Sequence, residues 1–393
     1  MRSQCGDVWL LSKYKITAEK LYLIALIIFM TSSMLATTMF PIPGKLYTLS
    51  KLIALFLIGC KIAWYDRYTI RQFLAVGSLM GIALLVKVVS GYMDPLWWVL
   101  LLIGAKDIPF EKILKVYVVL AGGIVAFAVV ASLLGVIVNL QYDAGDRGIR
   151  NSFGIVYPTD FAAHIFYLMT TIFYLNRKRV SGICYLVAMG ITGLVYYFCN
   201  TRLDVACMVL AIAGYLWLDR RKSESYRIKT VYNRQKKKQG YINYAMPAAA
   251  VLMTVLSWLY DEKYAWMMMI NSLISNRLRF GYQGLVEYGF RLFGQYVKMV
   301  GNGSTTEITT KYYFFIDCSY LYVGLQYGLI FLLAVLLIYV LCCRKYQNDR
   351  YFLLTIVLIS INCMIAHHLL EIAYNPFALA LFAKMTKEEC HSS

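Results

Sequence analysis

Two adjacent histidines and a glutamate near the end of the chain are the residues best suited to acid–base chemistry. His368 lies three residues before Glu371 and His367 lies four before it, so either imidazole can meet the carboxylate on a helix. An imidazole held by a carboxylate can serve as a general base. We expect His367, His368 and Glu371 to form a catalytic group in which either histidine is the base. The alternative is a pair of interfacial histidines with no chemical role.

Six arginines form a second group, because each falls in a segment that the charge pattern below places outside the membrane. Guanidinium groups bind phosphate through two parallel hydrogen bonds and suit this task better than lysine, so the group would fit a pyrophosphate. Where an arginine lies on a predicted surface helix, snorkelling to the membrane interface is an equally good explanation. The six are Arg147, Arg150, Arg202, Arg277, Arg279 and Arg291, of which Arg279 and Arg291 fall on such a helix.

No motif of a cofactor-dependent or metal-dependent enzyme accompanies these residues. The sequence contains no glycine-rich phosphate loop, no HExxH pair, no DxD-type acidic motif and no cysteine–histidine cluster with metal-ligand spacing. We therefore expect neither a cofactor nor a metal ion.

Composition places these residues in a membrane protein. Of the 393 residues, 60% are hydrophobic and 15% are charged, against about 45–50% and about 25% in soluble domains. An ordinary soluble enzyme is thereby excluded, and the 15% aromatic content excludes a disordered chain. Lys and Arg number 39 and Asp and Glu number 21, so the net charge is +18. A net charge of this size can indicate a nucleic-acid-binding protein. The positions of the basic residues along the chain distinguish that explanation from membrane topology.

Apolar runs recur along the whole chain. A spanning helix needs about 20 mostly apolar residues, and about twelve runs approach that length. We predict an all-α, polytopic membrane bundle of about 12 transmembrane helices that forms a single integral membrane domain over residues 1–393. The predicted spans are 21–40, 47–65, 72–90, 95–105, 114–140, 159–175, 181–199, 203–218, 241–260, 319–343, 350–368 and 372–385, of which 95–105 and 372–385 are short enough to be re-entrant.

Basic residues fall in alternate connections between these spans, which predicts an orientation. Cytoplasmic loops are enriched in Lys and Arg, and the most basic connection is residues 219–240. We therefore expect this loop and both termini to be cytoplasmic. Topology then explains most of the charge, so no nucleic-acid partner is expected, and docking to anionic lipids is the secondary role for the loop.

The longest external segment, residues 261–318, carries two helical patterns. Apolar residues at helical spacing predict an amphipathic helix over residues 278–298, lying on the external surface or against the bundle. A second apolar stretch, residues 266–274, precedes it. Asp160 and His164, four residues apart at the start of the sixth span, are further candidates to line a cavity.

Several short motifs occur in the order and loop positions of a known family, across roughly residues 20–385. They are SFG at Ser152–Gly154 after Arg147 or Arg150, NTRLD at Asn200–Asp204, SNRLRF at Ser275–Phe280, LFG at Leu292–Gly294, DCSYLYVGLQYGLI at Asp317–Ile330 and HHLLEIAYNPFALALF at His367–Phe382. With its predicted spans and its large external loop late in the sequence, the chain resembles the Wzy-type O-antigen and capsular polysaccharide polymerases. These share a superfamily with the O-antigen ligases.

The resemblance implies an enzyme of the bacterial cell membrane. It would transfer a growing glycan from undecaprenyl diphosphate to a lipid-linked oligosaccharide repeat unit on the external face, without a metal. By matching position, Arg202 and Arg277 would hold the diphosphate, assisted by Arg147 or Arg150. The adjacent histidines would activate the acceptor hydroxyl, oriented by Glu371. The implied partners are the lipid-linked oligosaccharide, membrane lipids, and a chain-length regulator and a flippase of the same pathway.

Two other functions remain open. A flippase or other transporter of lipid-linked oligosaccharides would also have many spans, although transporters usually show related halves and the sequence has no evident internal repeat. An O-antigen-type ligase of the same superfamily would share the motifs and use a different acceptor.

Overall fold

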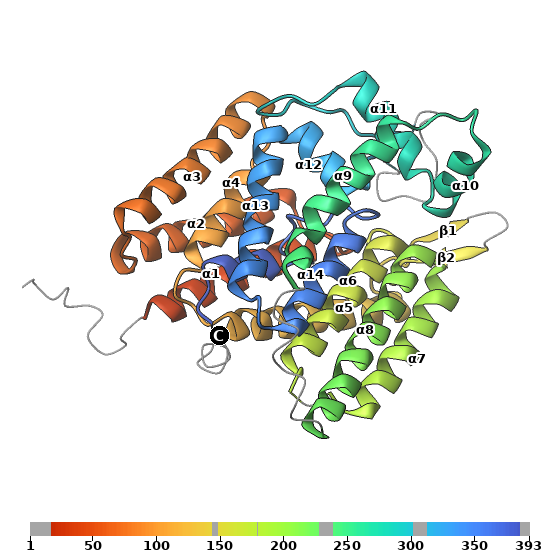
Figure 1. The fold of residues 1–393 in the computed structure, drawn as a ribbon, viewed down its shortest axis with the longest axis horizontal. Helices are drawn as coiled ribbons and strands as arrows, with labels where there is room; N and C mark the ends of the chain where they lie inside the picture. Colours follow the sequence, from red (N-terminus) through yellow and green to blue (C-terminus); the bar gives the residue numbers. More distant parts are fainter. Residues whose placement is uncertain (1–16, 144–147, 179, 228–238, 302–312, 386–393) are drawn as a thin grey trace, which may run out of the picture.

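The computed structural model of the chain is a bundle of α-helices with one small β-hairpin (Figure 1). It describes residues 17–143, 148–178, 180–227, 239–301 and 313–385. The elements are α1 (Ala18–Leu35), α2 (Gly44–Tyr65), α3 (Ile70–Ser90), α4 (Asp94–Gly104), α5 (Phe110–Leu133), β1 (Gln141–Asp143), β2 (Ile149–Asn151), α6 (Pro158–Leu175), α7 (Gly182–Cys199), α8 (Arg202–Arg227), η3 (Gln239–Tyr244), α9 (Ala245–Trp258), α10 (Ala265–Leu273), α11 (Arg277–Glu287), α12 (Ser319–Gln326), α13 (Leu329–Lys345), α14 (Arg350–Asn362) and η4 (Phe377–Leu381). A mostly helical fold is thus confirmed.

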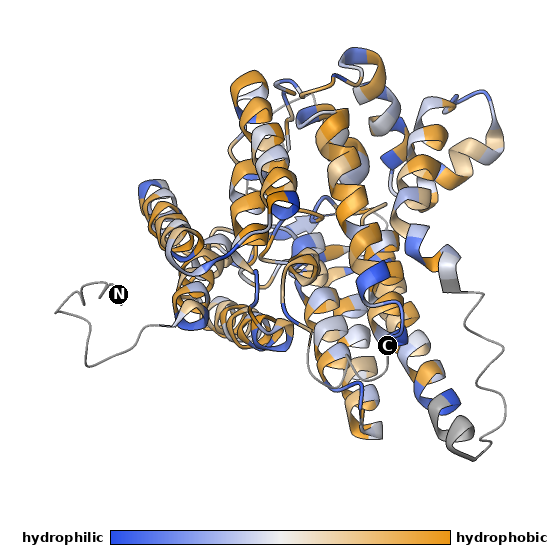
Figure 2. Ribbon diagram, turned by 60° about the vertical axis from the view of Figure 1, so that its left-hand side comes forward, coloured by the Kyte–Doolittle hydropathy of each residue, from blue (hydrophilic) through white to orange (hydrophobic). Residues whose placement is uncertain are grey.

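Six helices of the described chain are long and apolar enough to cross a membrane: α1, α2, α3, α5, α7 and the run Gly240–Trp258 that contains α9. Their outward faces are apolar as well. Phe56 and Trp64 of α2 and Val88 of α3 are 70%, 73% and 76% exposed, and Figure 2 shows helices that are hydrophobic over most of their length, with hydrophilic residues mainly near the helix ends. Extended apolar surfaces of this kind need a covering other than water, which indicates a membrane protein.

The predicted count of about twelve spans is not confirmed. α4 has 11 residues and α14 has 13, which at 1.5 Å per residue is about 16–20 Å, short of a hydrocarbon core of about 30 Å. The predicted span 114–140 ends at Leu133, and the chain leaves that helix through Gly135, whose φ is 74°.

The basic segment 219–240 is helical in its first part, because α8 continues to Arg227. Residues 228–238 lie outside the described chain.

The predicted span 372–385 is an internal segment and not a membrane helix. After α14 the chain runs through turns and the short η4, and residues 372–380 are all buried. The Lys345 ammonium group donates hydrogen bonds to carbonyl oxygens of this segment, at 2.8 Å for Ala380 and 2.9 Å for Leu381. Irregular backbone is tolerated in a membrane protein where protein surrounds it. The segment is apolar because it lies in the protein core. A segment that is buried in protein has the same apolar composition as one that faces lipid, so composition alone does not distinguish the two.

The predicted span 319–343 is broken between α12 and α13. Gly328 takes a left-handed φ of 92° at the break. The first amides of α13, at Leu329 and Ile330, donate to carbonyl oxygens of the loop at residues 291–292, at 2.9 and 3.1 Å. Backbone groups released by the broken helix are therefore satisfied by residues 291–292 of the long loop.

The amphipathic helix predicted over residues 278–298 is wrong in its second half. α11 ends at Glu287, and Gly289 takes a left-handed φ of 64°. The side-chain amide of Gln295 donates to the carbonyl oxygens of Tyr288 and Gly289, at 3.1 and 2.8 Å, and so caps the helix end. The apolar residues beyond this point belong to the loop that pairs with the α12–α13 break.

The hairpin of β1 and β2 follows α5 and pairs Tyr142 with Arg150. Its base is joined to α7, because the Asn151 side-chain amide donates to the Phe198 carbonyl oxygen at 3.3 Å. Figure 1 places the hairpin, α10 and α11 on the same side of the bundle. This side therefore gathers segments that are far apart in the sequence.

The backbone of Gly294 packs directly against the end of α12. A substitution at this position therefore tests how much the contact contributes to stability. Its φ is 81°, and an added Cβ would lie 2.1 Å from the Gln326 carbonyl oxygen. We expect Gly294→Ala to destabilise the protein by about 2–5 kcal/mol, from left-handed strain of about 1–2 and a backbone clash of about 1–3 kcal/mol. Thermal unfolding of the detergent-purified protein measures the change.

The matched control is Gly123→Ala in α5, where an added Cβ meets nothing within 4 Å. This variant should be neutral or up to about 1 kcal/mol more stable, because alanine is the better helix former. Equal melting temperatures for the two variants would show that the close packing of Gly294 against the α12–α13 break does not stabilise the protein.

Candidate active site

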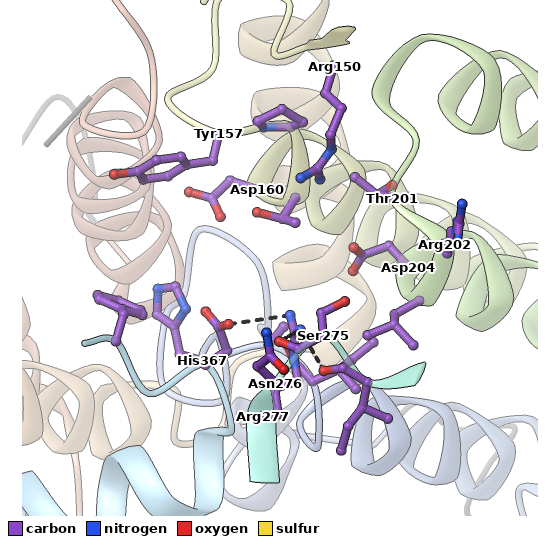
Figure 3. Close-up of a pocket in the computed structure, with 18 of the residues that line it drawn as sticks. Arg150, Tyr157, Asp160, Thr201, Arg202, Asp204, Ser275, Asn276, Arg277 and His367 are labelled. Carbon is purple, nitrogen blue, oxygen red and sulfur yellow. Dashed lines mark hydrogen bonds and ion pairs between the residues drawn. The ribbon is translucent and has the colours of Figure 1, made fainter. Parts of the chain in front are cut away.

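A cavity of about 1030 Å³ opens on the side of the bundle that carries the hairpin. Six parts of the described chain line it: the hairpin with the start of α6, the α7–α8 junction, the α10–α11 corner, Gly301, residues 313–317 and residues 365–368. Figure 3 shows their polar side chains converging from several elements. The volume lies at the upper end of the range for small-molecule sites, which is about 300–1,000 Å³.

Arg277, the first residue of α11, joins two walls of this cavity. Its Nε donates to the Ile365 carbonyl oxygen at 2.7 Å, and its Nη1 donates to that of Ile274 at 2.9 Å. Its Nη2 forms an ion pair with Asp317 at 3.4 Å, and the side chain is 10% exposed. The guanidinium is thus held in one place before any ligand arrives.

The α10–α11 corner that positions Arg277 is built from strained backbone. Ser275 and Asn276 both take left-handed φ values, of 53° and 64°, which is unfavourable for residues with a Cβ. Asn271 holds the corner, because its Nδ2 donates to the Asn276 Oδ1 at 3.0 Å and its Oδ1 accepts from the Arg279 amide at 3.1 Å. Strain of this kind persists only where surrounding contacts over-determine it.

Arg150 and Arg202 line the cavity from the hairpin and from the α7–α8 junction. The Arg150 Nε donates to the Cys199 carbonyl oxygen at 2.9 Å. Arg202 opens α8 and is exposed, and within the described chain no hydrogen bond or ion pair joins its side chain to another residue. Its guanidinium is therefore free to turn toward a ligand.

The other three predicted arginines are placed differently. Arg279 is exposed and pairs with Glu262 at 3.9 Å, and Arg291 is exposed in the loop that meets the α12–α13 break. Neither lines the cavity. Arg147 lies outside the described residues.

His367, His368 and Glu371 lie together, although in a turn and not on a helix, since α14 ends at Asn362. The His367 Nε2 is 3.4 Å from the Glu371 Oε1, and the His368 Nδ1 is 3.3 Å from the Glu371 Oε2. Both histidines line the cavity. The ring of Tyr374 stacks on that of His368 with 3.7 Å between centroids, which fixes the orientation of this imidazole.

Ser319, the first residue of α12, holds the turn that carries the histidines. Its amide donates to the Cys363 carbonyl oxygen at 2.9 Å, and its hydroxyl donates to that of Ala366 at 2.6 Å. The same hydroxyl accepts from the Leu369 amide at 3.2 Å. One buried serine therefore satisfies backbone groups on both sides of His367 and His368.

The pKa values of the two histidines are shifted in opposite directions. Burial lowers the pKa of His367, and the neighbouring His368 cation lowers it further, to about 4. Burial also lowers the pKa of His368, but the carboxylates of Glu371 and Asp160 raise it by more, so the net shift is upward. Burial raises the pKa of Glu371, and the two histidines bring it down to about 2. At neutral pH the uncharged His367 is thus the imidazole that can accept a proton.

The donor atoms of His367, His368 and Glu371 lie within 4.8 Å of one another. Two imidazoles and a carboxylate are ligands that zinc accepts, so these are the residues that would hold a metal ion if the site took one. Each histidine also lies within ion-pair distance of Glu371, which accounts for the grouping by itself.

Four carboxylates line the cavity, those of Asp143, Asp160, Asp204 and Asp317, and the sequence predicts a substrate contact for none of them. The sequence predicts Asp160 as a cavity-lining residue, and its Oδ1 lies 3.8 Å from the His368 Nε2. Asp204 is part of the NTRLD motif, and it is 5% exposed on the cavity wall. The sequence signal for Asp204 is its place in a polar segment that carries Arg202 at the end of an apolar run. His164 does not line the cavity.

Comparisons of the chain with protein-family models, curated proteins and solved structures found no match.

The raised pKa of His368 predicts how stability depends on pH. A folded pKa above the unfolded value of 6.5 stabilises the protein below pH 6.5, and this stabilisation is lost as the pH rises through the folded pKa. The folded pKa of His367 is lowered, so its titration changes the folding stability only below pH 6.5 and does not contribute to this loss. We expect the melting temperature to fall from pH 6.5 to mildly alkaline pH, and Glu371→Gln to reduce this fall.

The matched control for this titration is Glu262→Gln, which changes a carboxylate that is 67% exposed and does not line the cavity. Its profile should follow that of the wild type. Superimposable profiles for the wild type and Glu371→Gln would contradict the assigned coupling.

Proposed function

We propose that this chain is a polysaccharide polymerase of a bacterial cell membrane, which transfers a growing glycan from undecaprenyl diphosphate to a lipid-linked repeat unit. The observation that carries the proposal is the shared cavity, because Arg150, Arg202 and Arg277 line it together with His367 and His368. These cations and this base come from separate parts of the sequence. The cavity opens at a bundle with apolar outward faces, which suits a substrate whose lipid stays in the membrane.

The arginines are assigned to the leaving group. In the proposed reaction the bond between the anomeric carbon of the growing glycan and the diphosphate breaks, and the bonding electrons leave with the diphosphate. Negative charge grows on its oxygens, and cations that are already in place stabilise it. Arg277 is held in advance, whereas Arg202 is free to follow the diphosphate. Arg279 and Arg291 have no part in this assignment.

His367 is assigned to the acceptor. The acceptor hydroxyl gives its proton to His367 while its oxygen forms the new bond to the anomeric carbon. His367 is favoured over His368 because its lowered pKa keeps it uncharged. His368 packs against it with 4.4 Å between ring centroids and is itself paired with Glu371, so this pair positions the base. The diphosphate linkage supplies the driving energy, and the proposal invokes no nucleotide.

The proposal places the cavity on the external face and both termini in the cytoplasm. α8 supports this arrangement, because it begins at Arg202 on the cavity wall and runs for 26 residues to Arg227. A helix of that length spans about 39 Å, enough to separate the cavity from the basic segment 219–240 by a bilayer. A chain-length regulator and a flippase of the same pathway are the proposed partners.

Arg202→Ala tests the leaving-group assignment with little risk to folding, because the side chain has no partner in the described chain. We expect polymer formation to fall by about 100-fold or more, the usual effect of removing one preorganised donor at a developing charge. The measurement is gel analysis of lipid-linked glycans in a host strain that lacks its own copy of the gene.

Lys263→Ala is the control for Arg202→Ala, because it removes an 86% exposed basic side chain from the long external segment. Polymer should form normally in this variant. Wild-type polymer in Arg202→Ala as well would remove Arg202 from the site.

Deletion of the gene separates the proposed polymerase from the other two functions. A polymerase deletion should leave single lipid-linked repeat units on the outer leaflet and no polymer. A flippase deletion would leave the same units on the inner leaflet, and a ligase deletion would leave full-length polymer that is never attached to its acceptor. Labelling of lipid-linked glycans from the outside of intact cells distinguishes the three outcomes.

A further inference from the structure

Asp204 is a buried carboxylate for which the proposed reaction has no use. It lies in the first turn of α8 and is 5% exposed. Within the described chain no hydrogen bond, and no ion pair within 4.0 Å, joins it to another residue. It lines the cavity, and Figure 3 shows its carboxylate directed toward the interior. Neither carboxylate oxygen is a solvent-inaccessible atom without a partner, so both are open to the cavity and can accept hydrogen bonds from a ligand there.

Asp160 places a second carboxylate on the same cavity, from the first turn of α6. Its one ion-pair partner in the described chain is the His368 Nε2, at 3.8 Å, which is beyond hydrogen-bond distance. Asp160 and Asp204 act on each other electrostatically, so they share one region of the cavity. Each carboxylate can accept several hydrogen bonds, and the protein fills few of these positions.

The surrounding charges narrow the class of ligand that these carboxylates can take. Arg277, His368 and Arg150 act on Asp204, and they would repel a metal ion or an ammonium group. Asp204 and Asp160 would in turn repel an anion. Neutral hydrogen-bond donors suit both sets of charges, and a sugar ring presents several hydroxyl donors at once.

Aromatic rings on the cavity wall can contact the apolar face of a sugar. Two ring pairs line the cavity: Tyr142 with Tyr157, at 5.7 Å between centroids, and Phe280 with Tyr313, at 5.5 Å. The face of an aromatic ring is electron-rich, and the C–H groups on one face of a sugar ring are weakly positive. Aromatic walls with a few placed polar groups are typical of ligand sites.

We propose that Asp204 and Asp160 form a sugar-binding subsite, in which their carboxylates accept hydrogen bonds from the hydroxyl groups of a neutral sugar ring of the substrate. Arg202 lines the same cavity, so the proposed diphosphate and the sugar ring occupy one site. The subsite deepens the proposed function and rests on it for the identity of the cavity as the substrate site.

Saturation-transfer NMR on the full chain in nanodiscs tests the subsite directly. The probes are the methyl glycosides of galactose, glucose, N-acetylglucosamine and rhamnose, all neutral. We expect signals from ring protons of at least one probe with the wild type, and about tenfold weaker binding to Asp204→Asn, which replaces a charged acceptor by a neutral amide. Lys263→Ala should bind like the wild type. The absence of a saturation-transfer signal from all four probes, or unchanged binding by Asp204→Asn, overturns the proposal.

Melting temperature separates ligand binding from a structural role of Asp204. Asp204→Asn keeps the shape of the side chain and removes an unpaired charge, so its melting temperature should equal or exceed that of the wild type. A lower melting temperature together with weaker sugar binding would assign Asp204 to the fold and overturn the subsite. Displacement of the sugar by magnesium ions would assign the carboxylates to a cation and overturn it equally.

Failure of the proposed function would look different from failure of the subsite. Normal polymer in the deletion strain, with sugar binding that depends on Asp204, would reject the polymerase and keep the subsite. Loss of polymer in the deletion strain, with no sugar binding by the wild type, would reject the subsite and keep the polymerase.

Discussion

The structure depends on one constraint, which is that backbone groups leaving a helix inside an apolar bundle must find new partners. At the α12–α13 break, the amides of Leu329 and Ile330 are satisfied by carbonyl oxygens of the loop at residues 291–292. At the end of α14, Ser319 satisfies the backbone on both sides of the histidines. Irregular backbone is allowed at such depth only when protein or a cavity surrounds it. The irregular segments near the candidate site are therefore joined to neighbouring segments by backbone hydrogen bonds.

The cavity combines charges of both signs, and their pairing gives each a different role. Arg277 and His368 have carboxylate partners and are held in place. Arg202 and Asp204 stand two residues apart without a partner in the described chain. Groups that are paired in advance are suited to positioning, and groups that lack a partner are suited to a ligand. A substrate with a negatively charged diphosphate beside a neutral sugar would satisfy both unpaired groups.

Local patterns predicted some features well and others badly. The helical class followed from composition. The proximity of His367, His368 and Glu371 was predicted correctly, although a turn and not a helix brings them together. The predicted count of about twelve spans is not confirmed, because residues 372–380 are buried in the protein core and residues 319–343 are interrupted at Gly328. The helix predicted over residues 278–298 failed because Gln295 caps α11 from the loop beyond it, a contact that periodicity does not contain.

The sequence by itself determined that this is an apolar, helical chain with membrane-length segments and a small set of residues capable of chemistry. Those properties depend on runs of neighbouring residues and on spacings within one or two helical turns. Only the tertiary structure decided that Arg150, Arg202 and Arg277 line one cavity while Arg279 and Arg291 do not. The same holds for the unpaired state of Asp204. Whether a charged side chain meets a partner depends on how α6, α8, α11 and the turn after α14 pack, and spacing along the chain carries no record of that packing.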